Sequence, residues 1–307
     1  MAPAAQPTHA GRHRRVLIAL VFNVAIVAVE LAGGVLAHST ALFADAGHNL
    51  ADVASLVFAL VALRFALRAP TASRSYGYHR ATILSALANV ALLFALTTLI
   101  VAGAVLRLLH PTAVHGGTVA VIGAIALVCN GIGAALVFER GQDLQMRSLL
   151  VHLGGDALAS VGVILVGIVV MTTGHFSILD PVISLLISAL ILFQGVGVAR
   201  ESVAVLLEGA PRDIDPARLA GAITGVEGVD SVHDLHCWSL SSELRAVSAH
   251  IVLQGHPSLE EAQLVGGAVK SAIAVPFGLA HATLELECEP CGEEDTLICT
   301  IGFADVH

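Results

Sequence analysis

Charged side chains are scarce in this chain, and their scarcity excludes an ordinary soluble protein. Only 13% of its 307 residues are Asp, Glu, Lys or Arg, and 56% are hydrophobic, whereas soluble domains carry about 25% charged and about 45–50% apolar residues. Aromatic residues make up just 4%, while 29 glycines suit the close packing of helices in lipid. Together with a mean hydropathy of +0.84, these proportions indicate a membrane protein with several spans.

Cysteines and catalytic motifs are also few. Five cysteines in 307 residues exclude a disulfide-stabilised scaffold and favour a reducing, cytoplasmic environment. The sequence has neither a Walker A loop nor an HExxH motif, so it shows no means of hydrolysing ATP and no zinc-protease signature. No nucleic-acid partner is expected; the net charge of −9 agrees with this, but much of the acid lies after Glu208, so the figure describes the tail and not the membrane part.

Six apolar runs are long enough to cross a bilayer, whose hydrocarbon core of about 30 Å requires about 20 helical residues. Arginines collect before the first run, between the second and third, and between the fourth and fifth. Because positive charge stays in the cytoplasm, we expect a multi-pass protein of the cell (inner) membrane with both termini cytoplasmic. The runs are Val16–Ala37, Thr40–Ala66, Ala81–Leu109, Gly116–Phe138, Leu149–Met171 and Ile178–Leu207.

The composition becomes mixed and polar after Glu208, which predicts a small cytoplasmic domain. A helix is predicted over Pro216–Thr224, and the capping box formed by Ser258 and Glu261 predicts a second helix to about Ala274. Three stretches alternate polar and apolar residues as half-buried strands do: Val229–Leu240, Leu244–Gln254 and Ala280–Cys288.

The predicted fold is therefore an α-helical membrane domain with six spans followed by an α+β domain. The order αββαβ, with two helices on one face of a small sheet, is similar to that of metallochaperones. The predicted division is an N-terminal arm over residues 1–15, a membrane domain over 16–207 and a metal-binding regulatory domain over 208–307.

Ionisable residues inside the spans are candidates for function, because each costs about 2.5–3.5 kcal/mol in the bilayer. Asp45, His48 and Asp52 share one face of the second run, and His152 and Asp156 share a face of the fifth. Two imidazole nitrogens and two carboxylate oxygens from two helices predict a tetrahedral zinc site. Calcium and magnesium prefer oxygen ligands, while manganese, cobalt, nickel and iron fit the donor types as well.

Other polar residues of the spans have less specific interpretations. Asp45 is either an outer metal ligand, a proton acceptor, or a partner for a polar group such as Asn23 or Asn49. Three further residues are interpreted as hydrogen-bond partners between helices rather than as ligands: Glu30, Asn89 and Asn130.

Several segments resemble the cation diffusion facilitator family, specifically its zinc-transporting branch. They are FADAGHNLAD (43–52), YGYHR (76–80), HLGGD (152–156), DP (180–181) and VHDLHCW (232–238). The resemblance implies a homodimeric metal/proton antiporter with a metal-binding cytoplasmic tail. It also implies that the transport site consists of His48, Asp52, His152 and Asp156, with Zn²⁺ as the transported ion and as a ligand of the tail.

The side chains themselves favour exchange with protons. Imidazole has an ordinary pKa of about 6.5, and metal ligands must lose their protons before they bind. Protonation of the same atoms then expels the ion. A chain without a nucleotide motif could drive transport in this way with a proton gradient.

A second metal site is predicted in the tail. If Ser241 and Ser242 form a hairpin tip, His233 and His250 face each other, with Cβ atoms about 4.5–5.5 Å apart. By resemblance, His281 is the third ligand and Glu287 a later acidic one. Because six strand residues span about 20 Å, His281 and Glu287 cannot hold the same ion within one chain, and we favour His281.

Cys288 and Cys291 have the spacing of a zinc knuckle without a second such pair, so they are only additional candidates for the tail site.

The predicted function is export of Zn²⁺ in exchange for protons, and not an enzymatic activity. Two alternatives stay open: a membrane-embedded metal sensor, and an intramembrane metalloenzyme, which would need a vacant coordination position that four protein ligands do not leave.

Overall fold

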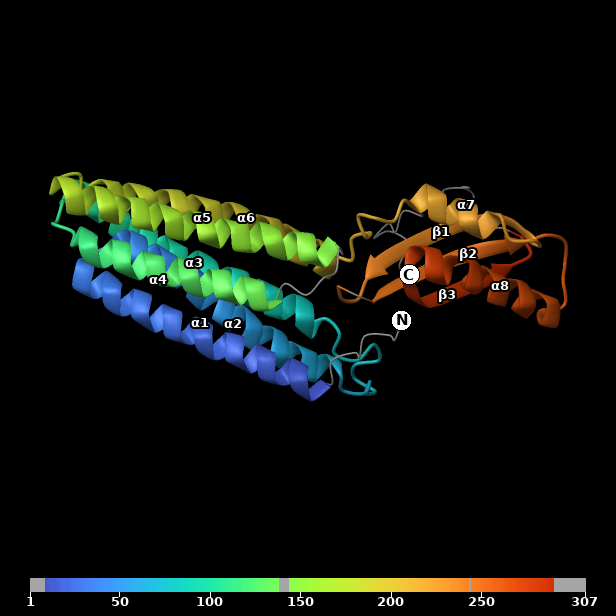
Figure 1. The fold of residues 1–307 in the computed structure, drawn as a ribbon. Helices are drawn as coiled ribbons and strands as arrows, with labels where there is room; N and C mark the ends of the chain where they lie inside the picture. Colours follow the sequence, from blue (N-terminus) through green and yellow to red (C-terminus); the bar gives the residue numbers. More distant parts are fainter. Residues whose placement is uncertain (1–8, 138–143, 243, 290–307) are drawn as a thin grey trace, which may run out of the picture. The chain divides into compact units, whose positions relative to one another are not determined.

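The computed structural model describes residues 9–137, 144–242 and 244–289, without the side chains of 9–19, 22, 133–137 and 144–153. Its elements divide into two compact units (Figure 1). The first comprises residues 1–60 and 86–199, and the second comprises residues 61–85 and 200–307.

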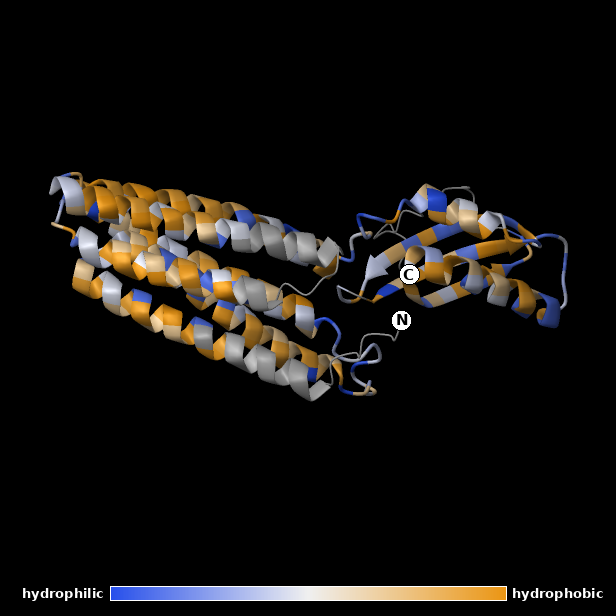
Figure 2. Cartoon of the chain, viewed as in Figure 1, coloured by the Kyte–Doolittle hydropathy of each residue, from blue (hydrophilic) through white to orange (hydrophobic). Residues whose placement is uncertain are grey.

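The six predicted spans are confirmed as six helices. They are α1 (His9–Ala37), α2 (Thr40–Ala66), α3 (Ala81–Leu109), α4 (Gly116–Val137), α5 (Leu144–Thr173) and α6 (Leu179–Leu206). Most of the coloured residues along these helices are hydrophobic (Figure 2). Within the described residues, four segments have the length and hydropathy of a membrane span: α2, α3, α6 and residues 154–173 of α5. The apolar described parts of α1 and α4, residues 23–37 and 116–132, are shorter.

Helices α4 and α5 cross at two glycines that leave no room for a side chain. A Cβ atom on Gly116 would lie 2.5 Å from the carbonyl oxygen of Gly167. A Cβ atom on Gly167 would lie 2.5 Å from the backbone nitrogen of Ala120. The two backbones are therefore in direct contact, as small residues allow between membrane helices.

Helices α2 and α6 are joined at their N-termini by one buried carboxylate. Asp180 accepts hydrogen bonds from the hydroxyls of Ser39 and Thr40 and from the backbone N–H of Thr40, at 2.6 Å. These donors include one of the N–H groups that an α-helix leaves unpaired in its first turn. A residue of α6 thus caps α2 and fixes the two helix starts side by side.

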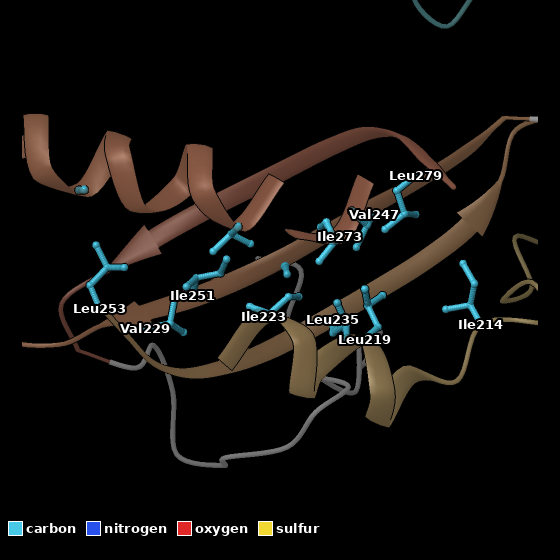
Figure 3. Packing of buried hydrophobic residues seen from close by; sticks show 13 residues of the cluster. Ile214, Leu219, Ile223, Val229, Leu235, Val247, Ile251, Leu253, Ile273 and Leu279 are labelled. Atoms are coloured by element: carbon cyan, nitrogen blue, oxygen red, sulfur yellow. The ribbon is translucent and has the colours of Figure 1, made fainter. Parts of the chain in front are cut away.

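The C-terminal domain has the predicted αββαβ order: α7 (Pro216–Thr224), β1 (Val229–Ser239), β2 (Arg245–Leu253), α8 (Leu259–Phe277) and β3 (Leu279–Glu287). The sheet order is β1-β2-β3, with β1 antiparallel and β3 parallel to β2. Helices α7 and α8 contact each other as well as the sheet. They form one core with the strands (Figure 3), in which Leu219, Ile251 and Ile273 are fully buried.

Helix α8 begins as predicted and ends later. Ser258 and Glu261 form the capping box, but the helix runs past Ala274 to Phe277 with Pro276 in its last turn. Gly278 adopts a left-handed conformation (φ 62°), and its N–H bonds to the carbonyl of Ala274. This cap satisfies the helix end, so the proline does not have to stop the helix.

Candidate metal centres

A buried group in the membrane domain brings together His48 and Asp52 of α2 with Asp156 of α5. The Nε2 atom of His48 lies 2.8 Å from Oδ1 of Asp156 and 4.0 Å from Oδ2 of Asp52. The side chains of His48 and Asp156 are each 9% exposed, and that of Asp52 is 31% exposed. One donor atom from each of the three lies within 4.8 Å of the other two.

The spacing of these atoms fits a divalent ion such as zinc. Donors about 2.1 Å from a tetrahedral zinc ion lie about 3.4 Å from one another. The observed separations of 2.8 and 4.0 Å fall on either side of that value, so small side-chain rotations suffice. The donor set of one imidazole and two carboxylates suits zinc and other first-row transition metals better than calcium or magnesium.

The predicted fourth ligand lies outside the described side chains. His152 belongs to α5, four residues before Asp156, in the stretch whose side chains the structure does not describe. The structure therefore brings together three members of the predicted transport site.

Asp45 lies next to this group without belonging to it. Its carboxylate is 1% exposed and accepts a hydrogen bond from Ser160 Oγ of α5 at 3.3 Å. Asn49 instead donates to both carboxylate oxygens of Glu30, at 3.0 and 2.9 Å. Glu30 is thus an interhelical hydrogen-bond partner, as predicted.

Asn89 and Asn130, given the same interpretation, each have a buried amide atom without a partner in the described part of the chain. Among the described residues, no hydrogen bond between helices supports the prediction for these two asparagines.

In the tail, the predicted pairing of His233 with His250 is confirmed, although the reason is different. Near the turn the strands pair one residue off the assumed register. There Ser239 faces Arg245, whereas the assumed hairpin would pair Ser239 with Leu244. A bulge between His233 and His236 then restores the pairing of His233 with His250. Asp234, in this bulge, has a left-handed backbone (φ 49°), and such bulges often re-aim side chains next to functional sites.

Glu287 completes a three-residue group with the two histidines. The imidazole rings of His233 and His250 lie 5.2 Å apart. Glu287 reaches His250 Nδ1 at 2.8 Å and His233 Nε2 at 3.4 Å. His233 is 3% exposed. Two imidazoles and one carboxylate are a known zinc donor set that leaves one coordination position open, and these residues therefore fit a bound metal ion.

His281 lies at the other end of β3, which corrects the preference for it over Glu287. In the parallel register His281 faces Ala246, whereas Glu285 faces His250 and Glu287 faces Val252. The exposed His281 ring contacts the hydroxyl of Thr283 at 3.3 Å and meets the Tyr76 ring edge-on, with the ring centroids 5.6 Å apart. The length of β3 keeps His281 and Glu287 apart, and the register of the strand places Glu287, at its C-terminal end, against the histidines.

The cysteines contribute no ligand to the described groups. Burial raises the pKa of the Cys237 thiol, an effect that Arg245 partly offsets, and this residue packs against the core. Cys288 is exposed and free. Cys291 lies outside the described residues.

Two site features were not predicted. Asp234 contacts His236 at 2.8 Å and His250 at 3.6 Å, which places a further carboxylate beside the tail group. Asp180 joins α2 to α6. The sequence gives a signal only for Asp180, which is an ionisable residue next to a proline at the start of a span.

Six apolar helices with a buried imidazole–carboxylate group, followed by a small sheet domain with a second such group, define a multi-pass membrane transporter of metal cations. The cation efflux transmembrane domain model matches residues 16–207. The model of the cytoplasmic domain of cation efflux proteins matches residues 211–289. The chain belongs to the cation efflux (cation diffusion facilitator) family.

Curated relatives are similar over nearly the whole chain. A cadmium, cobalt and zinc/H(+)-K(+) antiporter of Bacillus subtilis is 32% identical, covering 94% of this chain and 94% of the relative. Zinc transporter ZitB of Escherichia coli is 34% identical over 92% of this chain and 90% of the relative. Metal cation efflux system protein CzcD of Cupriavidus metallidurans is 33% identical, with coverages of 93% and 90%. These similarities support metal cation efflux.

Proposed function

We propose that this protein exports Zn²⁺ from the cytoplasm in exchange for protons. The proposed transport ligands are His48, Asp52 and Asp156 together with His152. The observation that carries the proposal is the 2.8 Å contact between His48 of α2 and Asp156 of α5. It joins two helices of a membrane domain through a pair of buried metal-ligand side chains.

The same contact supports coupling to protons. A neutral or charged imidazole that bonds to a carboxylate does so through a proton, and an ion bound between the two must replace that proton. Metal and proton therefore compete for the same atoms. The names of the relatives, which include a zinc/H(+)-K(+) antiporter and zinc transporters, support zinc as the ion and proton exchange as the mode.

For the tail we propose a second, resident metal site made by His233, His250 and Glu287, which regulates transport. We also propose a homodimer, a cytoplasmic location of both termini, and a cell (inner) membrane protein divided into residues 1–15, 16–207 and 208–307. The cytoplasmic-domain match and the arginine distribution support these assignments.

The test is zinc flux into proteoliposomes that contain the purified full-length protein, measured with and without an imposed pH gradient. We expect flux that depends on the gradient in the parent, and no flux in His48→Ala or Asp156→Ala. Zinc binding without any flux in the parent would overturn the proposal and favour a metal sensor.

A further inference from the structure

The turn between α1 and α2 carries a histidine that lies beside a histidine of the connection between α3 and α4. The imidazole rings of His38 and His115 have centroids 6.1 Å apart, and their planes are inclined by 33°. Both residues are exposed. Neither belongs to the two metal groups described above, so this pair of ligand-type side chains has no role in the proposed transport and tail sites.

The backbone holds the two histidines in this arrangement. The N–H of His115 donates to the carbonyl of Ala37, the residue before His38, at 3.1 Å. His38 has a left-handed backbone (φ 52°), which is uncommon for residues with a side chain although histidine adopts it more often than most. Arg107 of α3 donates to the carbonyl of His38. The position of the His38 ring is therefore set by contacts with two other parts of the membrane domain.

The charged groups bonded to this turn are one of each sign. Arg107 brings a positive charge to the carbonyl of His38. Asp180 of α6 brings a negative charge to the next two residues, because it accepts hydrogen bonds from the hydroxyls of Ser39 and Thr40. The turn therefore presents no net positive charge that would repel a cation from the two imidazoles.

The ring separation is close to that of two imidazoles on one metal ion. With zinc–nitrogen bonds of about 2.1 Å and a tetrahedral angle, two ring centroids lie about 5 Å apart. The centroids of His233 and His250 in the tail are 5.2 Å apart, so the 6.1 Å of the exposed pair requires only a small rotation of side chains. Imidazole suits zinc, copper and nickel, whereas calcium and magnesium take oxygen ligands. Water can occupy the remaining coordination positions of an exposed ion.

We propose that His38 and His115 form a third metal site, which binds one divalent transition-metal ion between the α1–α2 turn and the start of α4. Two protein ligands make it weaker than the three-residue tail group. If both termini are cytoplasmic, as proposed above, the connections after α1 and α3 lie outside the cytoplasm, and the site meets ions on that side of the membrane. A bound ion adds a link between the turn that begins α2 and the start of α4.

The experiment is equilibrium dialysis of the purified full-length protein against Zn²⁺, followed by metal analysis. A reference protein carries both Asp156→Asn and Glu287→Gln, which remove one ligand from each of the two stronger sites. We expect this reference protein to keep about one zinc ion per chain, and to lose it after a further His38→Gln or His115→Gln substitution. His175→Gln, at an exposed position between α5 and α6, is the matched control and should keep the ion.

The double substitution tests whether the two histidines share one ion. His38→Gln combined with His115→Gln should remove no more zinc than either substitution alone, and a loss of two ions would contradict a shared site. Equal zinc contents in His38→Gln, His115→Gln and His175→Gln would overturn the inference. His38→Gln introduced into the parent should likewise cost about one ion per chain, a comparison that covers a reference protein that does not fold.

The side of the membrane is tested separately. A membrane-impermeant maleimide added to intact cells should label His38→Cys above the level of the parent, and a protein that stays unlabelled would overturn the outer location. Neither measurement depends on transport. Absence of zinc flux in the parent would exclude the proposed function and leave the third site standing, whereas unchanged zinc contents in the histidine variants would exclude only the third site.

Discussion

The Nε2 atom of His48 and the Oδ1 atom of Asp156 lie 2.8 Å apart, although the residues are 108 positions apart in the sequence. One comes from α2 and the other from α5, so the contact measures how closely these helices approach at the proposed transport site. Any ion held there must enter between the two helices and displace the proton that the two atoms share.

Replacing Asp156 should remove most of the zinc affinity. Loss of a residue that only orients a metal ligand costs about 10–100-fold in affinity, so we expect at least about 100-fold for Asp156→Asn. Titration calorimetry of the membrane site measures this change. Asp230→Asn, at an exposed position of β1, is the matched control and should bind as the parent does. Parental affinity in Asp156→Asn would contradict the ligand assignment.

Replacing His48 by aspartate should weaken discrimination against cadmium. The α2 donors would then be two carboxylates, which do not impose the directional nitrogen coordination of an imidazole. We expect the ratio of zinc to cadmium flux to fall in His48→Asp proteoliposomes. A ratio equal to that of the parent would show that selectivity arises elsewhere.

The tail offers a pair of variants on one strand. Glu287→Gln should lower the amount of metal bound per protein by about one ion, because this residue reaches both His233 and His250. His281→Gln should leave the amount unchanged, since His281 lies at the other end of β3. Metal analysis of the purified proteins measures the bound metal in both variants. Loss of one ion in His281→Gln but not in Glu287→Gln would identify His281 as the ligand instead.

Asp180→Ala should destabilise the membrane domain by about 1–3 kcal/mol, because buried donors of Ser39 and Thr40 would lose their acceptor. Ser184→Ala is the matched control: this buried hydroxyl, one turn further along α6, has no hydrogen-bond partner in the described part of the chain. Thermal unfolding in detergent should show a lower Tm for Asp180→Ala and little change for Ser184→Ala. Equal Tm shifts in the two variants would contradict the expected stabilisation of the start of α2 by Asp180.

Acid should loosen the start of α8. Hydrogen bonds from the backbone and hydroxyl of Ser258 lower the pKa of Glu261, so its capping contribution is present above the ordinary pKa of glutamate and is lost as the pH falls through the lowered value. Hydrogen exchange in the first turn of α8 should therefore quicken on acidification, after correction for intrinsic rates. Glu261→Gln should abolish this pH dependence, whereas Glu260→Gln should retain it.

Length and hydropathy predicted the membrane helices well. Helices α2 and α3 have the predicted bounds, because polar or helix-breaking residues flank both apolar runs. Helix α5 begins at Leu144, five residues before its apolar run, since a helix continues into water wherever its residues favour it. The end of α8 was predicted too early because the cap at Gly278 was not recognised.

The candidate sites were predictable only where helical or strand periodicity places residues on one face. That periodicity groups Asp45, His48 and Asp52, but it does not tell which of them turns toward α5 and which toward α1. In the tail, the bulge at Asp234 and the parallel register of β3 decide that Glu287 reaches the histidines. Bulges and helix rotations depend on tertiary packing, and a single sequence does not record them.

The glycine crossing of α4 and α5 determines where the membrane domain can change shape. Because the two backbones are in direct contact at Gly116 and Gly167, we expect these two helices to move together. Helices α2 and α5 are joined instead through side chains, by the His48–Asp156 and Ser160–Asp45 hydrogen bonds, and such contacts can rearrange. Spin labels across the first pair should keep their separation during turnover, and labels across the second should report two distances.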